Sequence, residues 1–142
     1  MKHIEHIGIA VRNLQEACGV YKRLLGVGPY KTEEVSSEGV LTAFFKAGPN
    51  KIELLQATTE QSAIAHFIEK KGEGMHHIAF AVDDIQAEMA RLKGEGFTLL
   101  NEEPKRGADN KWICFVHPKD TNGVLIEPVS YTHLTLPTIL RV

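Results

Sequence analysis

The hydrophobic pattern of the first part of the chain switches from strand-like to helix-like and back. Apolar residues alternate with other residues over 6–11, which predicts a half-buried strand. From Leu14 they recur at the i, i+3, i+4, i+7 spacing of a helix packed on one face, namely Leu14, Ala17, Cys18, Tyr21, Leu24 and Leu25. Asn13 and Gly26 fit the N-cap and C-terminal stop of this helix. Strand patterns around 30–35, 40–46 and 51–55 complete a βαβββ order.

The second half of the chain repeats this order. Residues 6–15 (HIGIAVRNLQ) and 77–86 (HIAFAVDDIQ) share five of ten positions at an offset of 71 residues. A helix capped by Asp83 or Asp84 follows, with strand patterns at 98–101, 111–116 and 124–127. A linking helix is expected over 61–72. We therefore predict one α+β domain over 1–142, with βαβββ modules at about 1–58 and 74–128.

The last residues, from Val129, show neither helical nor strand periodicity. Their beginning, VSYTHLTLPT, is the translation of a DNA string that resembles a transposon-end adapter used in sequencing libraries. We expect 129–142 to be a non-native tail, which is left out of fold reasoning, so His133 is not considered a ligand.

Composition narrows the possible partners and the location. A net charge of −2 gives no basic footprint for nucleic acid. No stretch approaches the roughly 20 apolar residues of a membrane span. Cys18 and Cys114 match no metal or disulfide spacing, and two reduced, buried thiols are expected. A soluble cytoplasmic protein without nucleic-acid or membrane partners is therefore predicted.

Two histidines lie at equivalent positions on strand faces of small residues. Side chains alternate between the two faces of a strand. His6 therefore shares a face with Gly8 and Ala10, and His77 shares one with Ala79 and Ala81. The small neighbours leave open space beside each imidazole.

A carboxylate also lies within an apolar strand at the end of each module. Glu53 stands in KIELL, and Glu127 stands in VLIEP. A buried carboxylate is costly unless it is paired or coordinated. His6, Glu53, His77 and Glu127 would together satisfy both carboxylates around one divalent cation, with Co²⁺, Mn²⁺, Ni²⁺, Zn²⁺ and Fe²⁺ all left open by this ligand set.

These residues resemble the ligand pattern of the vicinal-oxygen-chelate superfamily, in which a histidine on the first strand and a glutamate or glutamine on the last strand of each module hold a metal. The resemblance implies that the modules pair into a cupped mixed sheet around that metal. It maps the ligands onto His6, Glu53, His77 and Glu127.

Within the superfamily, residues 6–128 resemble the methylmalonyl-CoA epimerases. The similar segments are FFKAG (44–48), KIELL (51–55), IAHFIEKKGEGMHHIAF (64–80), EPK (103–105), HPK (117–119) and GVLIE (123–127). The resemblance implies an acyl-CoA substrate, inversion at its C2 through an enolate, Co²⁺ as the first choice of metal, and a homodimer. Glu127 matches a residue that is both ligand and base. The second base of the family falls on Ser37 here, so the adjacent Glu38 is the candidate.

Other functions remain open on the same scaffold. A glyoxalase I-type lactoylglutathione lyase shares the four-ligand site, whereas an Fe²⁺ dioxygenase uses two histidines and one carboxylate. A metal-free small-molecule-binding resistance module is a third alternative. His76 either takes part in the site, by helping to hold the substrate or by supporting a ligand, or is a strand residue packed on the opposite face. The candidate contacts to CoA phosphates are the cationic side chains of Arg106, Lys111 and Lys119. Each of them is nevertheless expected to be a solvated surface charge.

Overall fold

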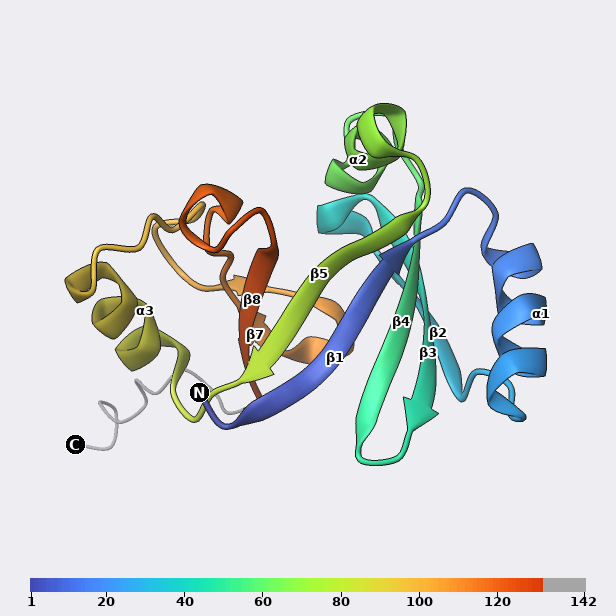
Figure 1. Cartoon of the computed structure of the whole chain (residues 1–142), viewed down its shortest axis with the longest axis horizontal. Coiled ribbons are helices and arrows are strands. Elements are labelled where there is room, and N and C mark those ends of the chain that lie inside the picture. Colours follow the sequence, from blue (N-terminus) through green and yellow to red (C-terminus); the bar gives the residue numbers. More distant parts are fainter. Residues whose placement is uncertain (132–142) are drawn as a thin grey trace. The chain divides into compact units, whose positions relative to one another are not determined.

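The computed structural model describes residues 1–131, which form two compact units (Figure 1). One unit is His6–His77, and the other combines Met1–Glu5 with the chain from Ile78 onward. The boundary passes through strands β1 (His3–Ala10) and β5 (Gly74–Ala81), the two strands that open the repeated segments. Each unit is described separately below.

The unit His6–His77 has the predicted βαβββ order. Strand β1 is followed by helix α1 (Leu14–Leu25), β2 (Lys31–Val35), the short 3-10 helix η1 (Ser36–Glu38), β3 (Val40–Ala47) and β4 (Asn50–Ala57). The strands lie in the order β2-β3-β4-β1, with β1 parallel to β4 and the other pairs antiparallel. The parallel pair is possible because α1 and two further strands separate β1 from β4 in the chain.

Helix α1 covers one face of this sheet. The Asn13 side chain accepts a hydrogen bond from the Glu16 backbone N–H, and Gly26 ends the helix at φ 81°. The core beneath the helix contains Val11, Leu14, Ala43, Phe45 and Leu54, with Ala17, Cys18, Tyr21 and Leu25 packed against it. Leu24 is 70% exposed, so its assignment to the apolar stripe was wrong. Leu24 lies on the solvent side of α1, although its neighbours in the sequence pattern face the core.

On the opposite face of the sheet, the unit's own helix α2 covers only one end. Helix α2 (Ala63–Lys71), capped by Ser62, packs Ile64, Phe67 and Ile68 on a cluster at one end of this face. That cluster contains Ala10, Val40 and Leu55. The middle of the same face is left to polar side chains, and the candidate site lies there.

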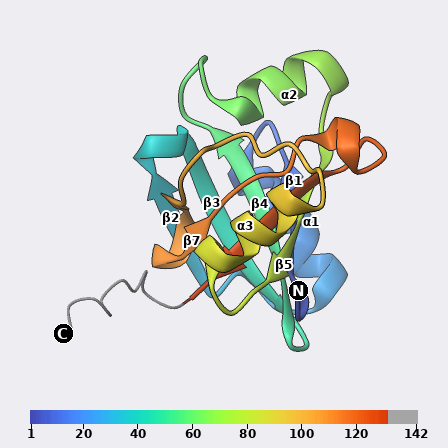
Figure 2. The same cartoon turned by 90° about the vertical axis from the view of Figure 1, so that its left-hand side faces the viewer.

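The second unit has the same order of elements after β5. It contains α3 (Ile85–Gly94), β6 (Lys105–Arg106), β7 (Trp112–Ile113) and β8 (Leu125–Ser130), with strands in the order β5-β8-β7-β6. Two further 3-10 helices span Ala108–Asn110 and Pro118–Asp120. Figure 2 views this unit from the side of α3, which packs Ile85 and Met89 against Val82 and Cys114.

The strand expected at 98–101 does not form. Leu99 makes only an isolated antiparallel bridge to Val116. The Thr98 backbone N–H donates to the Asp120 carboxylate at 2.7 Å, so a side chain takes the place of a strand neighbour there. The short strand β6 forms further along the chain instead.

Strand β8 extends two residues beyond Pro128. Val129 is buried, and the Ser130 hydroxyl donates to the Asp83 carbonyl. These residues begin the segment that we predict to be non-native, and His133 lies outside the described residues. Within residues 1–131, none of the helices has the length and apolarity needed to cross a bilayer.

The two cysteines differ in reactivity. Cys114 is fully buried, and burial raises the pKa of its thiol to about 12; Cys18 is half-buried, and burial raises its pKa too. Only the thiolate reacts with iodoacetamide. We expect the native protein to be alkylated much faster at Cys18 than at Cys114, as measured by peptide mass spectrometry. Equal labelling in denaturant is the control, and equal labelling of the native protein would contradict the burial of Cys114.

Candidate functional site

Three of the residues expected to hold a metal meet on the face of the His6–His77 sheet that lies opposite α1. His6 comes from β1, Glu53 from β4 and His77 from the start of the repeated segment in β5. They are 2%, 2% and 5% exposed. The strand register places Gly8 beside Glu53, so the carboxylate and the backbone next to His6 share one face.

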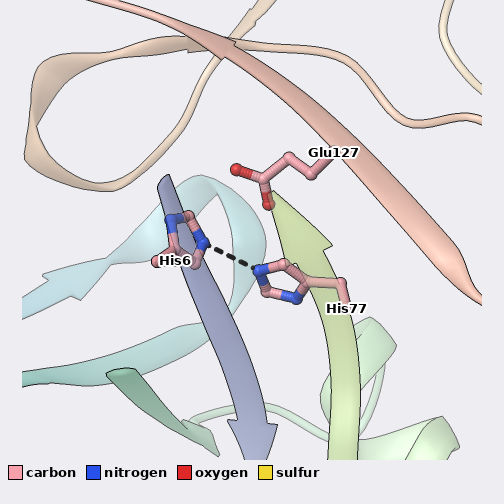
Figure 3. Close-up of side chains that lie close together, drawn as sticks. All are labelled: His6, His77 and Glu127. Carbon is pink, nitrogen blue, oxygen red and sulfur yellow. Dashed lines mark hydrogen bonds between the residues drawn. The ribbon is translucent and has the colours of Figure 1, made fainter. Parts of the chain in front are cut away.

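The two imidazoles face each other through their Nε2 atoms. His6 Nε2 lies 2.9 Å from His77 Nε2, and the rings meet edge to face (Figure 3). This spacing suits a hydrogen bond between neutral rings. It also suits two ligands at right angles on one cation, because metal–nitrogen bonds of about 2.1 Å separate such ligands by about 3 Å. The donor set therefore fits a first-row divalent metal.

The Nδ1 atoms of both rings are held from outside the pair. Glu53 Oε2 lies 3.2 Å from His6 Nδ1, and His76 Nδ1 lies 2.9 Å from His77 Nδ1. A carboxylate at this distance favours the tautomer of His6 that is protonated on Nδ1, which leaves Nε2 as an acceptor. The structure thus brings Glu53 to the far nitrogen of His6, in the place of an orienting carboxylate.

The His77 ring packs against the backbone of Gly8, which has no side chain. A Cβ atom added at Gly8 would lie 2.1 Å from Cε1 of His77 and 2.6 Å from both of its ring nitrogens. The imidazole therefore rests directly on the β1 backbone. Any larger residue at Gly8 would have to displace the ring.

His76 joins the site as a neutral neighbour. Its ring packs edge to face on Phe67 at 5.0 Å, and burial lowers its pKa to about 4. A neutral imidazole can donate or accept a hydrogen bond through Nδ1, so His76 can bond to His77 in either tautomer of the His77 ring. Of the two expected roles, the structure supports that of a residue supporting the site, since His76 contacts His77 directly.

The two residues expected to move protons come from other elements than the three residues of this cluster. Glu127 is buried on β8 of the other unit, and Figure 3 draws it on that strand. Glu38 ends η1. Val40, two residues after Glu38, lies four residues along β3 from Phe44, the residue opposite Glu53. At about 3.3 Å per residue along a strand, Val40 lies about 13 Å from the level of Glu53.

Sequence reasoning missed two polar residues on the same sheet face. Thr42 lies opposite both Glu33 and Leu55 in the register, and Glu33 is nearer to the level of Glu53 than Glu38 is. The Thr42 side chain is completely buried. The sequence signal was a hydroxyl inside the apolar run VLTAFF, on the face that also carries Phe44.

Of the cations considered for CoA phosphates, Lys111 is not a surface charge. It is 2% exposed, and its Nζ lies 3.2 Å from Glu5 Oε1. A buried ammonium requires such a partner, which corrects the expectation of a solvated side chain. Arg106 stacks over Trp112 at 4.4 Å, and Lys119 is exposed.

Comparison with known proteins assigns the family. Residues 5–115 match the model of the glyoxalase/bleomycin resistance protein/dioxygenase superfamily. The chain belongs to this superfamily. Membership confirms the expected α+β fold class, because solved structures of the family share it at high similarity.

Three relatives illustrate the similarity. The chain is 41% identical over 125 residues to human mitochondrial methylmalonyl-CoA epimerase, covering 87% of this chain and 71% of that protein. It is 41% identical over 126 residues to an ethylmalonyl-CoA/methylmalonyl-CoA epimerase of Cereibacter sphaeroides, covering 87% and 94%. A structure of Streptomyces coelicolor methylmalonyl-CoA epimerase with 2-nitronate-propionyl-CoA matches with TM-score 0.89 and 37% identity, covering 94% of this chain and 99% of that one.

The contact between Gly8 and His77 can be tested by adding one methyl group. We expect Gly8→Ala to lower the free energy of unfolding by about 1–3 kcal/mol, because the ring or the strand must shift. Thermal or urea unfolding measures this. Gly19→Ala is the matched control, since its Cβ would meet only the Arg23 side chain at 3.8 Å. That helical substitution should stabilise by about 0.5–1 kcal/mol. A Gly8→Ala protein as stable as the wild type would contradict the packing.

Proposed function

We propose that this protein is a divalent-metal-dependent methylmalonyl-CoA epimerase. The observation that carries the proposal is the buried His6–Glu53–His77 cluster, found in a chain that is similar over most of its length to epimerases from distant organisms. The reaction inverts the configuration at C2 of the acyl group. Those relatives favour the epimerase over a glyoxalase I-type lyase or a metal-free binding module.

The proposed metal ligands are His6, Glu53, His77 and Glu127. The facing Nε2 atoms of the two histidines support the first pair, and the repeat equivalence of Glu53 and Glu127 supports the second. Glu53 would leave the Nδ1 side of His6 to join them, and His77 would carry its proton on Nδ1. Co²⁺ is proposed first, with Mn²⁺, Ni²⁺ or Zn²⁺ as alternatives. When bound, such an ion supplies Lewis-acid stabilisation of negative charge on the acyl oxygens.

Two proton-transfer groups are proposed, because inversion requires a proton to leave one face of C2 and return to the other. Glu127 is assigned the first role from the family resemblance. Glu38 is assigned the second, although its distance along β3 means that the segment around η1 would have to move. Glu33 is the alternative, since it already lies on the sheet face of Glu53.

An acyl-CoA is the proposed substrate class. The anionic groups of an acyl-CoA would be attracted to the lysines on the sheet face of His6. Lys51 lies beside His6, and Lys46 lies opposite Lys51 in the register. We also propose that the protein works as a cytoplasmic homodimer, as the family resemblance implies.

The function is tested by following the C2 proton of methylmalonyl-CoA in deuterated water by NMR. We expect the metal-loaded protein to exchange this proton and to interconvert the two epimers. Chelation should abolish exchange, and Co²⁺ should restore it. Formation of lactoylglutathione from methylglyoxal and glutathione, with no C2 exchange, would instead identify the lyase.

The ligand set is tested by metal content. His6→Ala and His77→Ala should each lower bound metal, measured after dialysis, to less than one-tenth of the wild-type amount, since each removes one of the facing nitrogens. His66→Ala is the matched control, because His66 lies on α2 away from the cluster. Full metal occupancy in either site variant would refute the proposed ligands.

The proton-transfer groups are separated by amide substitutions. Glu127→Gln should reduce C2 exchange by about 10²–10⁴-fold, the usual contribution of a general base. Only one of the two variants Glu38→Gln and Glu33→Gln should lose epimerisation, namely the one that changes the second proton-transfer group. Stereospecific exchange without epimerisation is the expected signature. Unchanged epimerisation in both variants would exclude both residues.

A further inference from the structure

Three lysines lie together on the sheet face that carries the proposed metal cluster. Lys51 of β4 is the register neighbour of His6, and Lys46 of β3 lies opposite Lys51. Lys31 of β2 lies opposite Phe44, which is two residues from Lys46 along β3 and therefore points to the same face. Residues opposite one another in a sheet share a face, so all three lysines lie on the side of His6.

These lysines lie where a bound molecule can reach them. Lys46 is exposed, Lys51 is half-buried, and the Lys31 side chain is 37% exposed. Helix α2 packs near Leu55, which lies four residues, or about 13 Å, along β4 from Lys51. Figure 1 shows α2 at one end of this unit and the β3–β4 hairpin at the other. Within this unit, a long ligand held at the metal cluster therefore meets α2 in one direction and the lysines in the other.

Two aromatic rings hold two of the ammonium groups. The Lys46 Nζ lies 5.4 Å from the centre of the Tyr30 ring, and the Lys31 Nζ lies 5.2 Å from the centre of the Phe44 ring. The two rings also contact each other, with their centres 6.0 Å apart. Such cation–π contacts restrict side chains that are otherwise flexible. The ammonium groups are thus partly oriented before any ligand binds.

The pairing of Lys46 with Lys51 is unfavourable in the free protein. Like charges that lie directly opposite each other in an antiparallel pair repel and destabilise the sheet. The Lys31 Nζ lies 3.6 Å from the Glu33 carboxylate, which offsets its charge, whereas the Lys46 Nζ lies over a neutral ring. An anion bound between Lys46 and Lys51 would remove the repulsion. Lysine ammonium groups bind phosphate as point charges, which makes a phosphate a suitable anion.

We propose that Lys46 and Lys51 bind the phosphate groups at the nucleotide end of the acyl-CoA. The inference rests on the proposed function and adds which part of the substrate these residues recognise. The reacting carbon carries both the free carboxylate and the thioester, so both groups stay at the metal cluster. The phosphates lie beyond the pantetheine arm and must leave the cluster in the direction that α2 does not occupy. The nucleotide also carries several negative charges, which match a lysine cluster better than a single carboxylate does.

The recognition is tested by comparing methylmalonyl-CoA with methylmalonyl-pantetheine, which keeps the carboxylate but lacks the nucleotide. Lys46→Gln and Lys51→Gln should each lower the preference for the CoA ester, measured as the ratio of kcat/KM values, by about fivefold, the effect of one partly exposed ion pair. The change should lie in KM for the CoA ester. Lys70→Gln is the matched control, because Lys70 is an exposed lysine on α2. An equal loss with both esters would overturn the assignment to the phosphates.

Binding of 3′-phospho-ADP, the nucleotide of CoA, tests the site without turnover. Titration calorimetry should show binding to the wild type that weakens as salt is added, because salt screens exposed charges. The double variant Lys46→Gln/Lys51→Gln should weaken this binding by more than about tenfold. Wild-type affinity in the double variant, or no binding to a wild type that exchanges the C2 proton, would overturn this inference alone. Nucleotide binding without C2 exchange would instead remove the proposed epimerase and keep the lysine site.

Discussion

The site depends on a line of contacts that fixes two imidazoles with their Nε2 atoms face to face. Glu53 holds His6 from the Nδ1 side, and His76 holds His77 in the same way. Both rings are thereby limited in orientation, and Glu53 also favours one tautomer of His6, which is what a metal site requires of its histidines. The two Nε2 atoms also lie within hydrogen-bond distance of each other.

This line of contacts is possible only because the rest of the sheet face is built around it. Gly8 provides bare backbone for the His77 ring, and α2 occupies one end of the face with an apolar cluster. The opposite face carries the main core under α1. The apolar clusters of this unit lie on that side and beneath α2, so polar groups can occupy the centre of the face opposite α1.

The same reasoning connects the site to the proposed chemistry. Buried imidazoles and a carboxylate are the kind of donor set that attracts a divalent cation. His76 remains neutral because burial lowers its pKa to about 4, so it adds no positive charge that would repel the ion.

The sequence alone determined the elements and the repeated histidines, because strand and helix periods and cap residues are local properties of the chain. Asn13 and Gly26 mark the ends of α1 where expected, and the repeat selected His6 and His77. Tertiary structure alone decided that Glu53 contacts Nδ1 of His6 and that Lys111 is buried against Glu5. Leu24 and residues 98–101 were misjudged for the same reason. Which side chains meet depends on strand register and on competing contacts from distant residues, such as Asp120 at Thr98, and neither is encoded in local periodicity.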